Sequence, residues 1–135
     1  MGKMLLHGRK IVGGKVSGEA LVSHTPISFW GCVDPFTGIL TEAGHELEGQ
    51  SLTGKILVFP TGKGSTEGSH RILELATRGL GPLGFINTKG EVVTVLGAVL
   101  AEIPMVDRLD QDPVAVIKTG DKITLDADNG VVEVH

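Results

Sequence analysis

A short loop rich in glycine and hydroxyl groups contains the residues best suited to chemistry. Gly62, Lys63, Gly64, Ser65 and Thr66 follow an apolar run and precede a segment with helical spacing. N–H groups at the start of a helix lack intrahelical partners and carry partial positive charge, so this position suits a carboxylate, a phosphate or a developing alkoxide. Because Lys63 adds a full charge, the hydroxyl of Ser65 becomes a candidate base.

The alternative for this loop is structural. Ser65 or Thr66 would then only cap the following helix through its side-chain oxygen. A P-loop is excluded, because that motif places Ser or Thr directly after its lysine, whereas Gly64 follows Lys63 and position 57 is Leu57 and not glycine. Lys63, Gly64 and Thr66 are candidate substrate-binding residues, with a solvated lysine as the alternative for Lys63.

Metal ligands are scarce in this chain. The histidines are dispersed, and none pairs with a second ligand at metal-site spacing: His7, His24, His45, His70 and His135. The single cysteine, Cys32, cannot hold an iron–sulfur cluster, which needs three or four thiolates, and a small buried hydrophobe is its ordinary role. We expect no metal bound by this chain alone.

One histidine has a second interpretation. Ser69 and His70 open the predicted helix after a glycine-rich loop, an arrangement similar to that of swivelling domains that carry a phosphoryl group on histidine. The Gly-Gly pair typical of those domains before the Ser-His is absent. A phosphohistidine carrier at His70 therefore stays as the alternative of a different class, beside a solvated or helix-capping histidine.

The elements that position the loop form a β–loop–α–β unit. Residues 55–59 are a continuous apolar run typical of a buried strand, and the loop spans 60–68. Apolar residues then recur at helical spacing over 69–78 until glycine and proline end the helix, and the next strand is predicted over 83–86.

The rest of the chain predicts mostly strands. They are expected over 10–12, 19–22 and 27–30, with a turn at 34–38, a return strand at 39–40 and a polar loop over 42–50. A strand, a short helix and a strand at 103–106 are expected within 92–106. Strands at 122–125 and 131–134 flank Asn129-Gly130, a strong hairpin signal. The fold class is α/β but mainly β, in one domain spanning 1–135.

Composition excludes several function classes. The net charge of −4 comes without a basic stripe, so neither nucleic acid nor an anionic membrane is an expected partner. With one Trp and no Tyr, the chain lacks the aromatic platform that single-stranded nucleic acid needs. No apolar run is long enough for a signal sequence or a membrane span, so a cytoplasmic location is expected.

The chain resembles the swivel domain, or free small subunit, of the aconitase X family. The matching segments cover nearly the whole chain in the same order and are residues 27–31, 33–35, 37–38, 49–51 with 54, 57–60, 62–66, 68–69, 86–87, 97–98, 101–104 and 119–121. The family usually has glycine where Cys32 stands, which argues against a catalytic role for that thiol.

The resemblance implies a swivelling β/β/α domain like the C-terminal domain of aconitase. It also implies a heterodimer with a large subunit that carries an iron–sulfur cluster or iron, and an active site between the subunits. In the family the serine after Gly-Lys-Gly, here Ser65, is placed as the base that removes a proton beside the substrate carboxylate. The metal acts as Lewis acid on the departing hydroxyl. Ser28, Asn87 and Glu102 are weaker candidates for the same cleft.

The implied activity is that of a hydro-lyase acting on a hydroxy-carboxylate. Free small subunits resemble those of enzymes that convert 5-phosphomevalonate to trans-anhydromevalonate 5-phosphate in a modified mevalonate route to isoprenoids. Other members dehydrate cis-3-hydroxy-L-proline, often as one fused chain. Because this sequence is a stand-alone small chain, phosphomevalonate is the favoured substrate, and activity is expected only together with the large subunit.

Overall fold

The computed structural model describes residues 3–135 and is built around one eight-stranded sheet. The strands follow the order β1-β8-β7-β3-β4-β5-β6-β2. Their bounds are β1 Met4–His7, β2 Arg9–Val12, β3 Lys15–Val22, β4 Ile56–Phe59, β5 Gly84–Asn87, β6 Met105–Asp107, β7 Lys122–Asp126 and β8 Val131–Val134. The helices are α1 Phe29–Cys32, α2 Gly68–Thr77, α3 Val92–Ala101, α4 Pro113–Val116 and the 3₁₀ turn η1 Ala127–Asn129.

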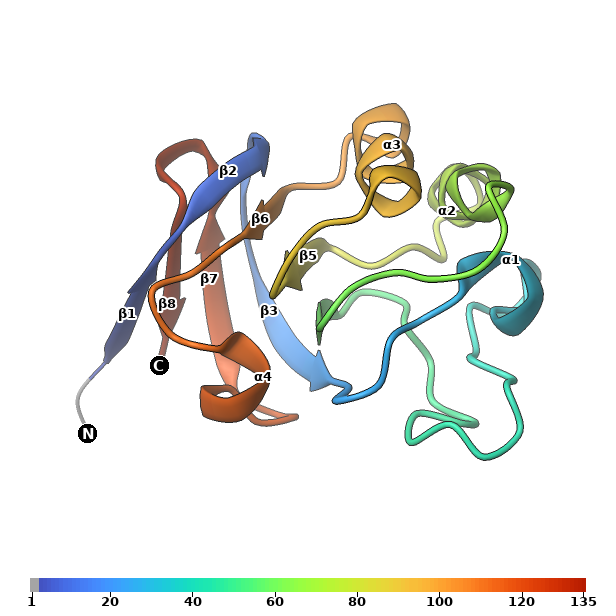
Figure 1. Cartoon of the computed structure of the whole chain (residues 1–135), viewed down its shortest axis with the longest axis horizontal. Coiled ribbons are helices and arrows are strands. Elements are labelled where there is room, and N and C mark those ends of the chain that lie inside the picture. Colours follow the sequence, from blue (N-terminus) through green and yellow to red (C-terminus); the bar gives the residue numbers. More distant parts are fainter. Residues whose placement is uncertain (1–2) are drawn as a thin grey trace.

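The sheet is rolled so that its two ends meet. β1 and β2 stand at opposite ends of the strand order, yet only Gly8 separates them in the chain. The N–H of Gly8 donates to the carbonyl oxygen of Gly130 at 2.8 Å, which ties this corner to the β7–β8 hairpin. Figure 1 shows β1 continuing into β2 across the sheet. Closure leaves few unpaired strand edges.

The centre of the sheet is parallel and buried on both faces. β3, β4, β5 and β6 pair in parallel, as expected for strands joined by helical crossovers. Successive β4 side chains alternate between two cores: Leu57 and Phe59 join one, and Ile56 and Val58 join the other. Continuous apolar sequence at 56–59 therefore reflects two-sided burial.

The helices divide between the two faces. Figure 1 shows α1, α2 and α3 gathered on one side of the sheet, and α4 lies on the other side, where it contacts β4. The first core lies beneath α1–α3, where the rings of Phe29, Phe59 and Phe85 meet edge to face with centroids 5.7–6.0 Å apart. Such aromatic contacts add to the free energy of simple burial. Among residues 3–135, no helix has the length and apolar character needed to cross a bilayer.

The β–loop–α–β unit and the hairpin are confirmed. The unit runs from β4 through α2 to β5, within one residue of the predicted bounds on each element. β7 and β8 pair antiparallel, and Gly130 adopts φ 67 at the end of the connecting turn. The mainly β architecture predicted from the sequence is confirmed.

Two predicted strands in the first half are wrong. Residues 27–30 contain only a single bridge, from Ile27 to Gly62, and the chain then turns into α1 because the ring of Phe29 packs into the aromatic core. Ile39 and Leu40 likewise form isolated bridges, to Ser51 and Val33, and not a strand. The predicted loop over 42–50 is confirmed as a series of turns.

The strand expected at the beginning of 92–106 is also wrong. The whole of Val92–Ala101 is one helix, and only Met105–Asp107 is a strand. The carboxylate of Glu91 accepts hydrogen bonds from the N–H groups of Val93 and Thr94, so a strong N-cap starts the helix although its sequence is rich in valine.

Candidate functional site

The loop after β4 is held by backbone pairing to a distant segment. The N–H of Ile27 donates to the carbonyl oxygen of Thr61 at 3.2 Å, and the N–H of Lys63 donates to the carbonyl oxygen of Ile27 at 3.0 Å. These two bonds fix the start of the predicted catalytic loop against residues 26–28. Because both bonds are main-chain, the loop entry is set by the fold, whatever side chains the two segments carry.

Gly62 allows a close approach to the start of α3. A Cβ at this position would lie 2.1 Å from Thr94 Oγ1 and 2.5 Å from Glu91 Oε1. These two atoms are themselves hydrogen-bonded at 2.6 Å as part of the α3 N-cap. Any larger residue would therefore displace the cap, and the glycine couples the loop to α3.

Gly64 brings the loop against Ser28. Its φ of +91° lies in the left-handed region, and an added Cβ would lie 2.5 Å from Ser28 Oγ. Ser28 was expected to face the same cleft as the loop, and the structure places its hydroxyl beside Gly64. The glycine satisfies two needs here, a positive φ and space.

Ser65 stands at the exposed tip of the loop. Its Oγ accepts a hydrogen bond from the N–H of Glu67 at 3.1 Å, and its carbonyl oxygen accepts one from the N–H of Gly68 at 3.0 Å. α2 begins at Gly68, with Glu67 as the residue before it, so Ser65 forms a turn ahead of the helix and does not cap its first turn. One N–H donor and the positive end of the α2 dipole therefore face this oxygen.

Thr66 continues the same turn. Its side chain is exposed, and its carbonyl oxygen accepts a hydrogen bond from Ser69 Oγ at 3.3 Å. The hydroxyls of Ser65 and Thr66 are thus both at the surface, next to each other in the chain, at the entrance to α2. This exposure suits a site that another molecule completes.

Lys63 forms an ion pair with a residue of the long irregular segment. Its Nζ lies 3.6 Å from Glu42 Oε2, and both side chains are partly exposed. An ion pair this long and this hydrated stabilises the fold by less than about 1 kcal/mol. The pair therefore leaves the ammonium available to a stronger anion.

Cys32 lies beside the same carboxylate. Burial, together with the neighbouring Glu42 carboxylate, raises the pKa of the Cys32 thiol, while Ser28 and Lys63 oppose the rise. The thiol is consequently protonated near neutral pH and is a poor nucleophile. It is half-buried at the edge of the site, not inside the core.

Glu42 is the site residue that sequence reasoning missed. It stands in a polar stretch with Glu46 and Glu48, and nothing in the local pattern distinguishes the three. Glu46 turns instead to His24 and Thr25, and Glu48 accepts a hydrogen bond from the N–H of Gly44. Only the fold, which brings residues 40–42 next to 32–33, separates Glu42 from its neighbours.

The other candidates lie elsewhere. Asn87 is fully buried and donates through Nδ2 to the carbonyl oxygen of Phe59, so it braces the end of β4. Glu102 ends α3 with φ 55 and borders a different hollow, with Pro104. His70 is exposed on α2, its ring 6.3 Å from that of Trp30. The fold thus brings Ser28 to the loop but not Glu102.

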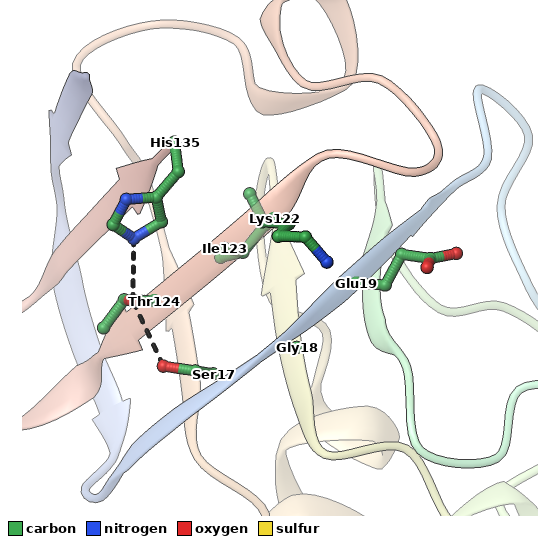
Figure 2. A pocket seen from close by; sticks show the side chains of 7 residues that line it. All are labelled: Ser17, Gly18, Glu19, Lys122, Ile123, Thr124 and His135. Atoms are coloured by element: carbon green, nitrogen blue, oxygen red, sulfur yellow. Dashed lines mark hydrogen bonds between the residues drawn. The ribbon is translucent and has the colours of Figure 1, made fainter. Parts of the chain in front are cut away.

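A separate hollow of about 380 Å³ opens on the sheet between β3 and β7. Figure 2 shows Ser17, Thr124 and His135 linked in a row, with oxygen and nitrogen atoms 3.1 and 3.0 Å apart. Glu19 and Lys122 stand at its other side (Figure 2). None of the predicted site residues borders it, and the side chains of Ser17, Thr124 and His135 are already bonded to one another.

A metal centre does not fit the donors of this chain. Among residues 3–135, no three His, Cys, Asp or Glu side chains gather in a way that would hold an ion. An iron–sulfur cluster requires three or four thiolates, and the chain has one cysteine. Any such group would have to be held by another polypeptide.

The chain was compared with known families and proteins. The family described as "Aconitase X swivel domain" matches residues 5–134. The phosphomevalonate dehydratase small subunit of Thermococcus kodakarensis is 51% identical, covering 97% of this chain and 96% of that protein. The protein of the same name from Methanocella arvoryzae is 48% identical, covering 96% and 98%.

Two solved structures are also similar to this chain. The crystal structure of Thermococcus kodakaraensis aconitase X in its holo-form superimposes with a TM-score of 0.93 at 50% identity, covering 98% of both chains. The solution NMR structure of a UPF0107 protein gives a TM-score of 0.90 at 44% identity, covering 98% of this chain and 99% of that one.

Proposed function

The chain belongs to the aconitase X swivel-domain family, and from this premise we propose that it is the small subunit of a phosphomevalonate dehydratase. This hydro-lyase removes water from 5-phosphomevalonate to give trans-anhydromevalonate 5-phosphate. The observation that carries the proposal is the combination of near-complete, about half-identical relatives of that name with an exposed Ser65 loop at the start of α2. We place the enzyme in the cytoplasm.

Ser65 is the proposed base. As an alkoxide, its Oγ takes the proton from the carbon next to the substrate carboxylate. The electron pair of that C–H bond forms the new double bond while the C–O bond to the hydroxyl carbon breaks. The hydroxyl leaves as water with a proton taken from solvent, and Ser65 later returns its own proton to solvent. The N–H of Glu67, 3.1 Å from Oγ, and the α2 dipole stabilise the negative charge on the oxygen.

Lys63, Gly64 and Thr66 are the proposed binding residues. The ammonium of Lys63, itself a residue of the loop, can balance the charge of an anionic substrate, because its present ion pair with Glu42 is weak. Gly64 has no side chain and a positive φ, so substrate can approach the backbone. The exposed hydroxyl of Thr66 adds a donor beside Ser65.

The departure of the hydroxyl needs a Lewis acid, which we assign to an iron–sulfur or iron centre of the large subunit because this chain lacks the ligands for one. The small subunit then contributes the base and part of the binding site. An active site divided in this way makes the isolated chain inactive and the heterodimer active.

The outer face of α3 supports such a partner beside the loop. Four large apolar side chains of this helix are about half or more exposed: Val92, Leu96, Val99 and Leu100. The inner face of the same helix packs against the loop, where Thr94 meets Gly62, so the apolar strip belongs to the helix that borders the loop. Contiguous exposed apolar surface on a folded chain usually marks an interface.

A single charge on this strip tests the placement of the partner. We expect Leu96→Lys to weaken assembly with the large subunit at least about tenfold, because the lysine ammonium would be desolvated at the interface. The unfolding free energy of the free subunit should change by no more than about 0.5 kcal/mol, since the side chain is at the surface. Unchanged assembly would show that α3 is not part of the interface with the large subunit.

Reconstitution tests the function itself. The small chain, the large subunit and their mixture are each incubated with 5-phosphomevalonate and with cis-3-hydroxy-L-proline, and water loss is followed by product analysis. The proposal expects turnover only in the mixture and only with phosphomevalonate. Turnover of hydroxyproline would move the chain to the other substrate class of its family, and turnover by the small chain alone would overturn the divided site.

The same reconstituted enzyme tests the alternative of a phosphohistidine carrier. His70 is exposed and near Trp30, but the relatives are named as dehydratase subunits, which favours dehydration over phosphoryl transfer. A His70→Ala variant that dehydrates normally in the reconstituted enzyme, with no acid-labile phosphate on the wild-type chain, would end that alternative.

A further inference from the structure

Glu42 has an unusual position next to the catalytic loop. One carboxylate oxygen, Oε2, faces the ammonium of Lys63 at 3.6 Å. The other oxygen, Oε1, is buried and has no hydrogen-bond partner among residues 3–135. Buried carboxylate oxygens are nearly always satisfied, so an orphan of this kind points to a functional reason to hold the charge there.

A thiol lies near this carboxylate. Cys32, Ser28 and Lys63 all interact within the same small region, and the pKa of the Cys32 thiol is raised by burial and then by Glu42, so the thiol keeps its proton. No hydrogen bond joins this thiol to Oε1 among the described residues, so that oxygen is left without a donor. Lys63, on the loop, is the charged partner of the other oxygen, Oε2.

The cluster is continuous with the loop that carries Ser65. Ser28, one of the groups at the thiol, also contacts Gly64, the residue before Ser65. The backbone around Glu42 is tied in as well, because the N–H of Thr41 donates to the carbonyl oxygen of Cys32 at 2.7 Å. A shift of the Glu42 carboxylate would therefore change the position of its ion-pair partner, Lys63.

We propose that Glu42 is a positioning residue that acts through Lys63, holding the ammonium at the edge of the loop where the substrate anion binds. This proposal rests on the proposed function and adds a residue to it. The ion pair orders a flexible side chain before substrate arrives, so less conformational entropy is lost on binding. Since it is weak, the substrate anion can share or replace it.

The kinetic test uses the reconstituted enzyme. Glu42→Gln keeps the shape of the side chain and removes its charge, so we expect KM for phosphomevalonate to rise about three- to fivefold while kcat changes less than about twofold. In a Lys63→Ala background, the same substitution should change KM less than about twofold, because the residue through which it acts is gone. Glu46→Gln, from the same loop but bonded to His24 and Thr25, is the matched control and should behave as wild type.

A second readout needs no turnover. In the free subunit, Glu42→Gln should lower the pKa of the Cys32 thiol, so that iodoacetamide alkylates it several-fold faster at mildly alkaline pH than in the wild type or in Glu46→Gln. An unchanged alkylation profile would contradict the placement of the Glu42 charge in this cluster beside the loop. An unchanged or lower KM in Glu42→Gln, or a full effect in the Lys63→Ala background, would overturn the positioning role.

The two readouts separate this proposal from the proposed function. If the wild-type pair dehydrates neither substrate, the function fails, and the alkylation profile still decides whether the Glu42 charge acts on this cluster. If the pair is active but Glu42→Gln has wild-type KM, only the positioning role fails.

Discussion

The β1–β8–β7 side of the molecule and the segment of residues 23–54 reach an ordered structure by different means. The first is a set of antiparallel strands in continuous register, with every pairing made by the main chain. The second contains one short helix and isolated bridges, yet it places several fully or almost fully buried side chains in the first core, among them Ile27, Phe29, Val33, Leu40, Leu47 and Leu52.

The difference shows where freedom for function lies. A strand in a ladder has its side-chain directions fixed in alternation, so few residues converge on one point. The irregular segment is anchored by its apolar side chains, and its polar ones are free to gather: Ser28, Cys32 and Glu42 meet the loop of Lys63 and Ser65. Site residues thus come from the part whose backbone follows no regular pattern.

The largest expected effect is on an anchor of the irregular segment. Phe29→Ala removes the ring that contacts Phe59 and Phe85, and we expect the unfolding free energy to fall by about 3–5 kcal/mol in chemical denaturation. Amide exchange should then increase most over 26–33 and 61–64, which are bonded to each other. Leu125→Ala, in the ladder region, should accelerate exchange throughout. If the two variants gave the same pattern of amide exchange along the chain, the two regions would not differ in how they are stabilised.

Another polar anchor of the sheet is Asp107, in β6. Its carboxylate is fully buried, accepts from Arg9 Nε and Nη2 at 2.9 Å each and from the N–H of Gly90 at 2.8 Å. Burial opposes the charge, but these donors outweigh it and lower the pKa of Asp107. Asp107→Ala should destabilise the fold by about 2 kcal/mol at neutral pH, because the Gly90 amide loses its acceptor and a cavity is left.

This effect should depend on acidity. A lowered pKa in the folded state means that the stabilisation is present above the ordinary aspartate pKa of about 4 and is lost as the pH falls through the lower folded value. The difference in unfolding free energy between wild type and Asp107→Ala should therefore shrink below about pH 4. A difference that stays constant down to pH 2 would mean that the carboxylate charge is not what stabilises this corner.

A smaller effect distinguishes two glycines of similar backbone geometry. Gly64 and Gly49 have φ of +91° and +82°, but an added Cβ meets Ser28 only at Gly64. Alanine at either position should cost about 1 kcal/mol through strain at positive φ. Only Gly64→Ala should also reduce turnover of the reconstituted enzyme, by displacing the loop. Equal turnover in both variants would show that the contact with Ser28 is unimportant.

Sequence patterns located the regular elements better than the irregular ones. The buried strand before the loop, the helix over 69–78 and the hairpin at Asn129-Gly130 are encoded locally, by apolar runs, helical spacing and turn residues, and all three are confirmed. The turn of helix at 29–32 was decided by distant contacts with the aromatic core, whereas the single long helix at 92–101 was decided by the neighbouring Glu91 cap, a local signal that the valine-rich pattern concealed.

The same limit applies to the site. The loop of residues 62–66 was recognisable because glycines, a lysine and hydroxyls adjoin one another between a strand and a helix. Glu42 was not, because its contact with Lys63 joins two loops that only the fold brings together. Contacts of this kind leave no periodic or local trace in a single sequence.

The central claim is that the Ser65 oxygen is the base of a divided active site. Its most direct test compares Ser65→Ala with Ser51→Ala in the reconstituted enzyme, since both serines are exposed and both accept a hydrogen bond from the N–H two residues ahead. We expect Ser65→Ala to lower kcat at least about a thousandfold with assembly unchanged, and Ser51→Ala to keep wild-type kcat. A Ser65→Ala enzyme within tenfold of wild type, or one that loses assembly and not turnover, would contradict the account.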